Sequence, residues 1–333
     1  MHSKEFQALV TRQNGETVSN ALEWRSPVSL SPGEVRIRTA YAGVNYKDCL
    51  AIQGQARIIR DFPRVGGIEA VGQIIESANS SFAVGDPVMA HGFDMGISQD
   101  GGFAQQLHVS GDHVQKIPSG LSLREAAVLG VPGFTVGLAL DRFEAQGLTP
   151  QSGPVAVSGA NGAVGMLTIA LLAQAGYEVV ALTRRTELAP ALQQLGASEV
   201  LDTAITQSNR PLETARFAAA IDNVGGAVLS WLLRSMSDSG QIASVGNAAG
   251  NTFEGSVLPF FVRRVQIFGV LANAPWEQRY RVWNRLATEW RPDFALLEPY
   301  VHVVELADVP DLVQRQLEGA AHGRSRDAYG DVL

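Results

Sequence analysis

The chain has 333 residues, of which 46% are hydrophobic and 18% are charged, and its formal net charge is -7. This composition is typical of a folded globular protein and excludes a disordered chain. The acidic balance opposes contact with a polyanion, so we expect no nucleic-acid partner. Cys49 is the single cysteine, which excludes an intrachain disulfide and a multi-cysteine zinc cluster and fits a cytoplasmic protein.

The first 130 residues predict a β-rich domain. The start, Met1 to Val10, has no apolar core of signal-peptide length, and its short alternation indicates a first strand. Further short apolar alternations are separated by Gly, Pro, Asn and Asp, at residues 34–44, 70–77, 84–92 and 101–109. This spacing is typical of a barrel-like domain rather than a helical bundle.

The sequence pattern changes at residues 131–270, where apolar strands alternate with Ala- and Leu-rich helical stretches. Six candidate parallel strands lie at residues 154–159, 177–183, 198–203, 217–224, 240–246 and 265–270. The pattern predicts a doubly wound parallel sheet. The most apolar window, Val164 to Leu182, contains Gln174, Gly176 and Glu178, so we interpret it as a buried helix and strand and expect no membrane partner.

The final stretch, residues 271–333, has a mixed pattern of helical and strand-like segments. An amphipathic helix is expected around Pro275 to Trp290, followed by a strand at residues 299–306. We expect this stretch to complete the first domain. The predicted domains are therefore residues 1–130, residues 131–270, and a return segment of residues 271–333.

A glycine-rich turn carries the first functional signal. Gly159, Gly162 and Gly165 lie between a buried strand and a helix, where backbone N–H groups and the helix N-terminus can meet a diphosphate. The backbone groups expected at the diphosphate are those of Gly162, Ala163 and Val164, with side-chain donors from Ser158 and Asn161. The alternative is that the glycines serve only tight strand-to-helix packing.

The end of the second strand bears on the choice of dinucleotide. NAD sites usually place an acid there to bind the ribose hydroxyls, whereas this chain has Thr183, Arg184 and Arg185. Two guanidiniums bind a 2′-phosphate through charge-assisted hydrogen bonds. The sequence predicts NADPH as the cofactor, and the alternative is two arginines on an exposed loop with no ligand.

Two later strand ends fall at the expected nucleotide crevice, because ligands in such sheets bind beyond the carboxyl ends of the strands. Asn223 is a candidate ribose or nicotinamide contact, and Gly246 follows the fifth strand. Asp222 is interpreted as a structural residue that bonds the loop backbone.

A resemblance to a known family covers nearly the whole chain. It rests on VNYKDCLAIQG (44–54), IIRDFPRVGGIEAVG (58–72), GFTV (133–136), SGANGAVG (158–165), AIDNVGG (220–226), LPFFVRRVQIFGV (258–270) and GRS (323–325). The chain resembles the zinc-free quinone-oxidoreductase branch of the medium-chain dehydrogenase/reductases, and within it the acryloyl-CoA reductase subgroup. Gly66 and Glu69 depart from the family's usual Pro and Asp, and the tail after Gly323 is longer than usual.

The resemblance implies an α/β fold, with a Rossmann doubly wound parallel sheet plus a GroES-like β-barrel domain. It implies nucleotide contacts from Tyr46, Thr183, Arg185, Asn223, Ile267 and Arg324. It also implies NADPH-dependent reduction of a conjugated carbon–carbon double bond, with acryloyl-CoA as lead substrate. A quinone acceptor is the alternative, and a nucleotide-binding protein without turnover is a third.

No metal site is expected. Catalytic zinc in related enzymes needs Cys, His and an acid, whereas Cys49 is a lone thiol and residues 66–69 contain no histidine. Hydrogen-bond donors must then stabilise charge on the substrate carbonyl. The candidates are Asn45 with its amide donors, Tyr46 with a donatable proton, and Asp48 as an acceptor that orients Lys47 or Tyr46. The alternative is a polar turn between two strands.

Two further expectations concern partners. Arg57, Arg60 and Arg64 lie close together in the sequence and could hold the phosphates of a CoA thioester, or could form a solvated surface. The sixth strand, residues 265–270, is expected at a sheet edge, which invites pairing with a second copy as a homodimer.

Overall fold

The computed structural model describes residues 5–208, 210–318 and 323–328, and the chain divides into two compact units. The first unit comprises residues 1–131 and 300–333, and the second comprises residues 132–299. The first predicted boundary, at residue 130, therefore agrees within one residue. The predicted return at residue 271 is wrong, because the chain returns to the first unit only at Tyr300.

The helix before the return explains this correction. Helix α7 (Trp276–Ala287) is the predicted amphipathic helix, and it packs on the part of α2 (Leu123–Ala145) that lies in the second unit, from Pro132 on. Trp283 stacks on Phe134 with ring centroids 5.9 Å apart, and Arg281 pairs with Asp141 at 2.8 Å. The buried face of α7 therefore belongs to the second core.

Two sheets form the first unit, in the described part of the chain. The smaller has the order β2-β1-β4, and the larger has the order β15-β16-β3-β5-β6-β8 with β7 paired to β3. The strands are β1 (Phe6–Asn14), β2 (Thr17–Arg25), β3 (Glu34–Val44), β4 (Arg64–Val65), β5 (Glu69–Ser77), β6 (Pro87–His91), β7 (Gln106–Ser110), β8 (Val114–Lys116), β15 (Val301–Val304) and β16 (Arg324–Ala328). The predicted β-rich domain is confirmed.

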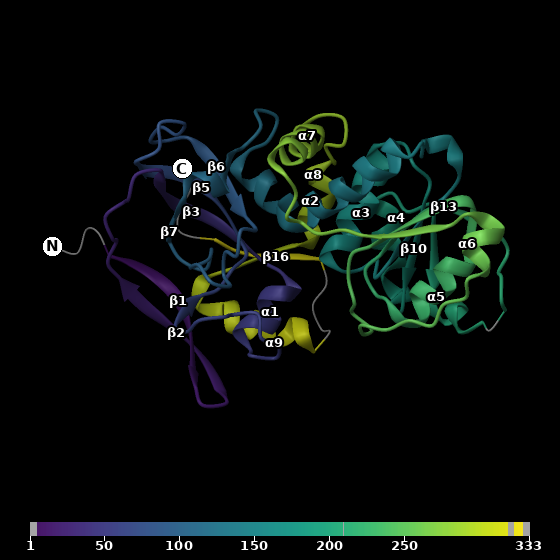
Figure 1. Cartoon of the computed structure of the whole chain (residues 1–333), viewed down its shortest axis with the longest axis horizontal. Coiled ribbons are helices and arrows are strands. Elements are labelled where there is room, and N and C mark those ends of the chain that lie inside the picture. The colour runs from purple at the N-terminus through teal and green to yellow at the C-terminus, as the bar shows by residue number, and fades with distance from the viewer. Residues whose placement is uncertain (1–4, 209, 319–322, 329–333) are drawn as a thin grey trace. The chain divides into compact units, whose positions relative to one another are not determined.

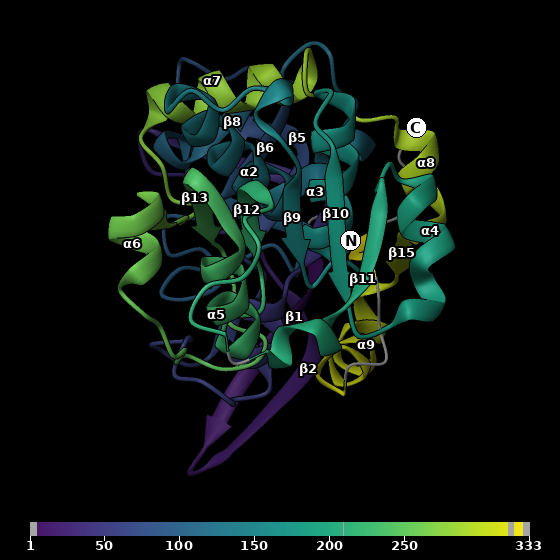
Figure 2. The ribbon, with the colours of Figure 1, turned by 90° about the vertical axis from the view of Figure 1, so that its right-hand side faces the viewer.

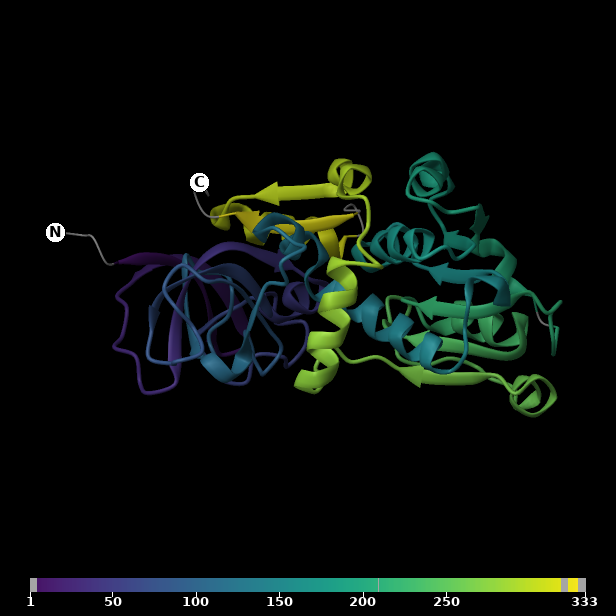
Figure 3. The ribbon, with the colours of Figure 1, turned by 90° about the horizontal axis from the view of Figure 1, so that it is seen from above.

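The C-terminal strands complete the larger sheet. β16 pairs antiparallel with β3, with Ser325 opposite Val44, and β15 pairs parallel with β16. Figure 3 shows these yellow strands beside the blue and purple strands of the first unit. The sheet therefore brings Arg324 next to the end of β3, although 280 positions separate them in the sequence. The rest of the long tail, residues 329–333, lies outside the described residues.

Helices α1 (Tyr46–Ile52) and α9 (Val309–Leu317) cover one core of the first unit. Leu9, Val44, Cys49 and Val313 meet in this core, each at most 3% exposed. Figure 1 shows α1 and α9 next to each other near β1 and β2. Since α1 starts directly after β3, this packing fixes the turn that carries Asn45 and Tyr46.

The second unit contains a six-stranded parallel sheet in the order β11-β10-β9-β12-β13-β14. The strands are β9 (Val155–Ser158), β10 (Val179–Thr183), β11 (Glu199–Asp202), β12 (Phe217–Asp222), β13 (Met236–Ser244) and β14 (Gln266–Gly269). All six predicted strands are confirmed. The strand order reverses between β9 and β12, which is where doubly wound folds bind ligands.

Four helices contact strands of this sheet: α3 (Ala163–Gln174), α4 (Ala189–Gln194), α5 (Gly226–Ser235) and α6 (Leu258–Arg263). A further helix, α8 (Phe294–Leu297), packs on α3. Figure 2 shows α6 beyond β13 at one side and α4 beside β11 at the other. β14 lies at the sheet edge, as predicted, and the homodimer through it stays a prediction.

One helix in the described part of the chain, α2, is long and apolar enough to cross a membrane. In the structure 78% of its apolar window is buried, as for a core helix. The window Val164 to Leu182 forms α3 and β10, as predicted.

Candidate functional site

The glycine-rich turn lies at the switch point of the parallel sheet. Gly159 follows β9 with φ +59°, a conformation that favours glycine. Gly162 is the N-cap of α3, and the N–H of Met166 is the first to bond back, to the Gly162 carbonyl. The N–H groups of residues 163–165 have no acceptor within the helix, so they can bind an anion together with the helix dipole.

Ser158 does not serve as the predicted donor. It is fully buried, and its hydroxyl donates to Asp222 Oδ1 at 2.6 Å while accepting from the Asn223 N–H at 2.9 Å. Asp222 also accepts from the N–H groups of Val224 and Gly225. Burial raises the pKa of Asp222. Asp222 is therefore a structural residue, as predicted, and the Ser158 side chain joins β9 to β12 instead of facing a diphosphate.

Asn223 completes this strand junction. Its Nδ2 donates to the Ser158 carbonyl at 2.7 Å. The Gly246 N–H bonds to the Asp222 carbonyl at 3.2 Å, and a Cβ at Gly246 would lie 2.7 Å from the Asn223 carbonyl oxygen. The structure thus brings Asn223 and Gly246 together at the carboxyl edge of the sheet, as predicted. Ile267 is half-buried and lies on β14, which is the third strand from β9 in the sheet order.

The end of β10 carries the predicted cofactor-selecting residues. The Thr183 hydroxyl donates to Asn161 Oδ1 at 2.9 Å and accepts from the Arg185 N–H at 3.0 Å. This leaves the Asn161 Nδ2 without a partner among the described residues. Arg184 is exposed, and Arg185 pairs with Glu187 at 3.1 Å. The sequence reasoning missed Glu187, which competes with any phosphate for Arg185.

In the first unit, Asn45 and Asp48 open helix α1 as a local hydrogen-bonded turn. Asp48 Oδ2 accepts from the Asn45 N–H at 2.9 Å, and Asp48 Oδ1 accepts from the Ile68 N–H at 2.9 Å. Asp48 is 1% exposed, whereas Tyr46 is 52% exposed. Asp48 therefore orients Asn45 and the 68–69 backbone, not Lys47 or Tyr46 as predicted.

The amide of Asn45 is already occupied. Its Nδ2 donates to Glu69 Oε1 at 2.9 Å and to Asp48 Oδ2 at 3.1 Å, and its Oδ1 accepts from Arg324 at 3.2 Å. The predicted role of Asn45 as a donor to substrate is therefore corrected to that of a positioning residue. The role predicted for Tyr46 stays a prediction, and its hydroxyl has no hydrogen bond to the described residues.

Arg324 is buried within the first unit. It is 3% exposed, forms a close ion pair with Glu69, and donates to the Ala127 carbonyl at 3.3 Å. These contacts hold its guanidinium inside the unit, and the nucleotide contact that the resemblance implies for Arg324 stays a prediction. Glu69 was not assigned a role from the sequence, and its departure from the family's Asp was the one signal.

Burial of Asp48 has a consequence for stability. Desolvation raises the pKa of Asp48 from 3.8 to about 7. A raised pKa means that Asp48 stabilises the fold below pH 4 and that this contribution is lost as the pH rises through about 7. The difference of about 3 pKa units corresponds to roughly 4 kcal/mol, at about 1.4 kcal/mol per unit.

We therefore expect Asp48→Asn to flatten the pH dependence of stability. The free energy of unfolding of the native chain, relative to the variant, should fall by a few kcal/mol between about pH 4 and about pH 7, as measured by urea denaturation. A constant difference across this range would contradict the raised pKa.

The three arginines predicted for CoA do not form one cluster of free cations. Arg60 pairs with Asp94 at 3.3 Å, and Arg64 pairs with Asp100 at 3.2 Å. Arg57 is exposed and has no partner in the described ranges of the chain. Arg57 and Arg60 are therefore the accessible members.

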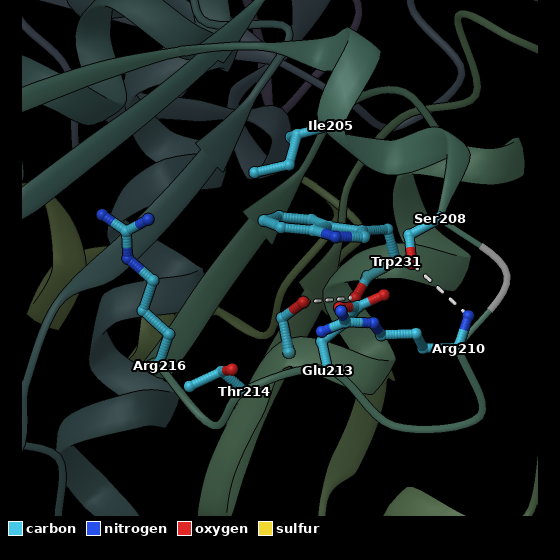
Figure 4. Close-up of a pocket in the computed structure, with 8 residues that line it drawn as sticks. Ile205, Ser208, Arg210, Glu213, Thr214, Arg216 and Trp231 are labelled. Carbon is cyan, nitrogen blue, oxygen red and sulfur yellow. Dashed lines mark hydrogen bonds between the residues drawn. The ribbon is translucent and has the colours of Figure 1, made fainter.

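A cavity of about 380 Å³ lies elsewhere in the second unit (Figure 4). Arg216 precedes β12 and Ser235 ends α5, so the cavity opens at the amino ends of the strands. Trp231 forms part of its wall, with Ile205 and Arg210 nearby. Since dinucleotides bind at the carboxyl ends, this cavity is separate from the candidate cofactor turn.

Comparisons with known proteins agree with this geometry. The model of the alcohol dehydrogenase GroES-like domain matches residues 31–119, and that of zinc-binding dehydrogenases matches residues 163–288. "Putative quinone oxidoreductase YhfP" of Bacillus subtilis is 37% identical, over 94% of this chain and 97% of that protein. The chain belongs to the medium-chain dehydrogenase/reductase superfamily. The predicted resemblance and fold class are confirmed.

Other members of the superfamily are similar over their whole length. Acrylyl-CoA reductase AcuI of Ruegeria pomeroyi is 37% identical, over 96% of this chain and 98% of that protein. The yhdH oxidoreductase of Salmonella enterica, solved with NADP, has a TM-score of 0.92 at 33% identity, covering 97% of this chain and 99% of its own. YhfP, solved with NAD, has a TM-score of 0.93 at 36% identity, covering 98% and 100%.

Many medium-chain enzymes use zinc, which makes the metal question testable here. Within the described ranges, no group of three or more His, Cys, Asp and Glu side chains is placed to hold a metal ion. We expect oxidoreductase activity to survive EDTA, with metal analysis showing less than one zinc per chain. Stoichiometric zinc whose removal abolishes turnover would contradict this expectation.

Proposed function

We propose that the protein reduces a conjugated carbon–carbon double bond with NADPH, and that an enoyl thioester such as acryloyl-CoA is its substrate. The observation that carries the proposal is the turn at the sheet switch point, with two arginines and no acid at the end of β10. AcuI and the NADP-bound yhdH support it among the relatives. NADPH would supply the hydride.

The residues of the second unit fit a dinucleotide. The free N–H groups of residues 163–165 suit a diphosphate, and the small Gly162 lets it approach the helix N-terminus. The Thr183 hydroxyl links the Asn161 side chain to the Arg185 N–H, and the Asn161 Nδ2 has no partner among the described residues. Arg184 and Arg185 are then placed on the same loop for the 2′-phosphate, Arg185 once it leaves Glu187.

The first unit supplies a donor for the acceptor substrate. Hydride addition to a conjugated carbonyl places negative charge on its oxygen, and the adjacent carbon later takes a proton. Tyr46 is exposed at the first turn of α1, and its phenol O–H can donate a hydrogen bond. Asn45 and Asp48 hold this turn in place.

A quinone acceptor is the second candidate, because YhfP carries that name among the relatives. Initial rates of NADPH oxidation with acryloyl-CoA, free acrylate and a simple quinone separate the candidates. Preference for the thioester supports the proposal, and preference for the quinone replaces it. Absence of turnover with every acceptor would leave a nucleotide-binding protein without catalysis.

We expect the accessible arginines to affect the thioester alone. Arg57→Gln with Arg60→Gln should lower kcat/KM for acryloyl-CoA several-fold, because binding of the remote CoA phosphates positions the reacting alkene. Added salt should mimic part of the loss, since exposed charges are screened within about 10 Å at 0.1 M. Quinone reduction should be unchanged. An unchanged kcat/KM for acryloyl-CoA would show that these arginines do not bind the CoA phosphates and belong to a solvated surface.

The assembly and location of the protein remain predictions. The edge strand β14 follows α6, where Val257, Phe261 and Val262 are 70%, 68% and 52% exposed. We propose that this apolar edge pairs with a second copy as a homodimer. A cytoplasmic location is proposed from the single buried cysteine.

A further inference from the structure

Glu69 occupies an unusual position in the first unit, because it contacts three segments that are far apart in the chain. Its Oε1 accepts from Asn45 Nδ2 and from Arg324, and its Oε2 accepts from the Val131 N–H at 2.6 Å. Glu69 is 3% exposed. One buried carboxylate thus joins the turn before α1, the strand β16 and helix α2.

The contact with Val131 falls at a break in α2. Gly130 has φ +48° and ψ -152°, which interrupts the helix and is open only to glycine. A restarted helix presents unbonded N–H groups, and a buried one needs an acceptor. Glu69 supplies that acceptor for Val131, the last residue of the first unit.

Two glycines make room for the ion pair. A Cβ at Gly43 would lie 1.8 Å from Glu69 Oε1, and a Cβ at Gly130 would lie 2.3 Å from Glu69 Oε2. Both would also fall within 2.4 Å of the Arg324 guanidinium. The backbone on both sides therefore closes on the pair, so that its position and that of the Asn45 amide are fixed together.

We propose that Glu69 and Arg324 are positioning residues, which hold the Asn45 amide and thereby the first turn of α1 with Tyr46 against the break in α2. The role of Tyr46 rests on the proposed function, whereas the network itself does not. The longer side chain of Glu, compared with the family's usual Asp, lets one carboxylate reach both Asn45 and Val131.

The network predicts an electrostatic signature at Asp48. Charged or titratable groups near Asp48 include Lys47 and Cys49 on α1 and Glu69 on β5. Arg324 of β16 bonds the same Asn45 amide, and His91 of β6 lies opposite Glu69 in the strand register. After desolvation and its bonds with Asn45, the charge of Glu69 further raises the pKa of Asp48. Removing that charge should therefore lower it, and the freed Arg324 cation acts in the same direction.

The test compares Glu69→Gln with Glu76→Gln, which removes a carboxylate from an Arg36 ion pair on the same strand. The Asp48 carboxyl is titrated by carbon-13 NMR of the whole protein, with Asp48→Asn assigning the signal. We expect the midpoint to fall in Glu69→Gln and to stay in Glu76→Gln. If the titration midpoint of Asp48 were the same in Glu69→Gln and in the native chain, the proposed network would be wrong.

A second variant keeps the charge but shortens the reach. In Glu69→Asp the Asp48 midpoint should stay near its native value, while kcat for acryloyl-CoA falls roughly tenfold with the KM for NADPH unchanged, as for a misplaced reacting group. If Glu69→Gln does not fold, the kcat of Glu69→Asp still tests the proposal. Unchanged kcat in Glu69→Asp would overturn the positioning role. If no acceptor is turned over, the proposed function fails, and the titration still decides whether the network holds.

Discussion

Replacing Arg185 with alanine is expected to weaken NADPH binding roughly ten- to a hundredfold, because each charge-assisted hydrogen bond contributes about 1.5–3 kcal/mol. NADH binding should hardly change, since NADH lacks the 2′-phosphate. Dissociation constants of both cofactors, measured by fluorescence titration, give the comparison. Equal loss for both cofactors would show that Arg185 does not bind the phosphate.

Glu187 provides a matched variant for this experiment. Its carboxylate lies 3.1 Å from Arg185 Nε and must release the guanidinium before a phosphate can take its place. Glu187→Gln should therefore strengthen NADPH binding and leave NADH unchanged, the opposite sign from Arg185→Ala. The NAD bound to YhfP makes this comparison decisive, because similarity over the whole chain leaves the cofactor preference open.

The secondary structure followed from the sequence where the hydrophobic pattern repeats. All six strands of the parallel sheet were predicted, because each is a short apolar run separated from the next by a helical stretch or a loop; the two edge strands, β11 and β14, are only partly buried. The predicted boundary at residue 271 was wrong because the amphipathic pattern shows that a helix has an apolar face but does not show which core that face packs against. The apolar face of α7 was visible in the sequence, whereas its partner, the face of α2 with Phe134, is set by tertiary packing.

The candidate site was predicted in part. Residue types at strand ends located the glycine turn, Asn223 and the arginines, since parallel strands place their carboxyl ends at one edge. Sequence does not show which donors are already used. Ser158 and Asn45 both look available, yet Asp222 and Glu69 occupy them, and these partners lie 64 and 24 positions away. The raised pKa of Asp48 likewise depends on burial.

Substitutions at two glycines of the same turn should have different effects. A Cβ at Gly165 would lie 2.4 Å from the Gly159 carbonyl oxygen and 2.6 Å from the Ala160 Cα, both backbone atoms with no room to move. Gly165→Ala should therefore destabilise the fold by about 1–3 kcal/mol or more, as overpacking does. Urea denaturation of the protein without cofactor measures this.

Gly162 instead faces open space, because a Cβ there would meet only the Gly159 carbonyl oxygen, at 3.4 Å. Its φ of -81° suits alanine, so Gly162→Ala should cost less than about 1 kcal/mol of stability, the scale of an N-cap change. A bound diphosphate close to this backbone would meet the new methyl group, so NADPH and NADH should both weaken by more than about tenfold. Loss of both cofactors distinguishes this variant from Arg185→Ala. Unaltered binding of both in Gly162→Ala would mean that the glycines serve only the packing of α3 on β9.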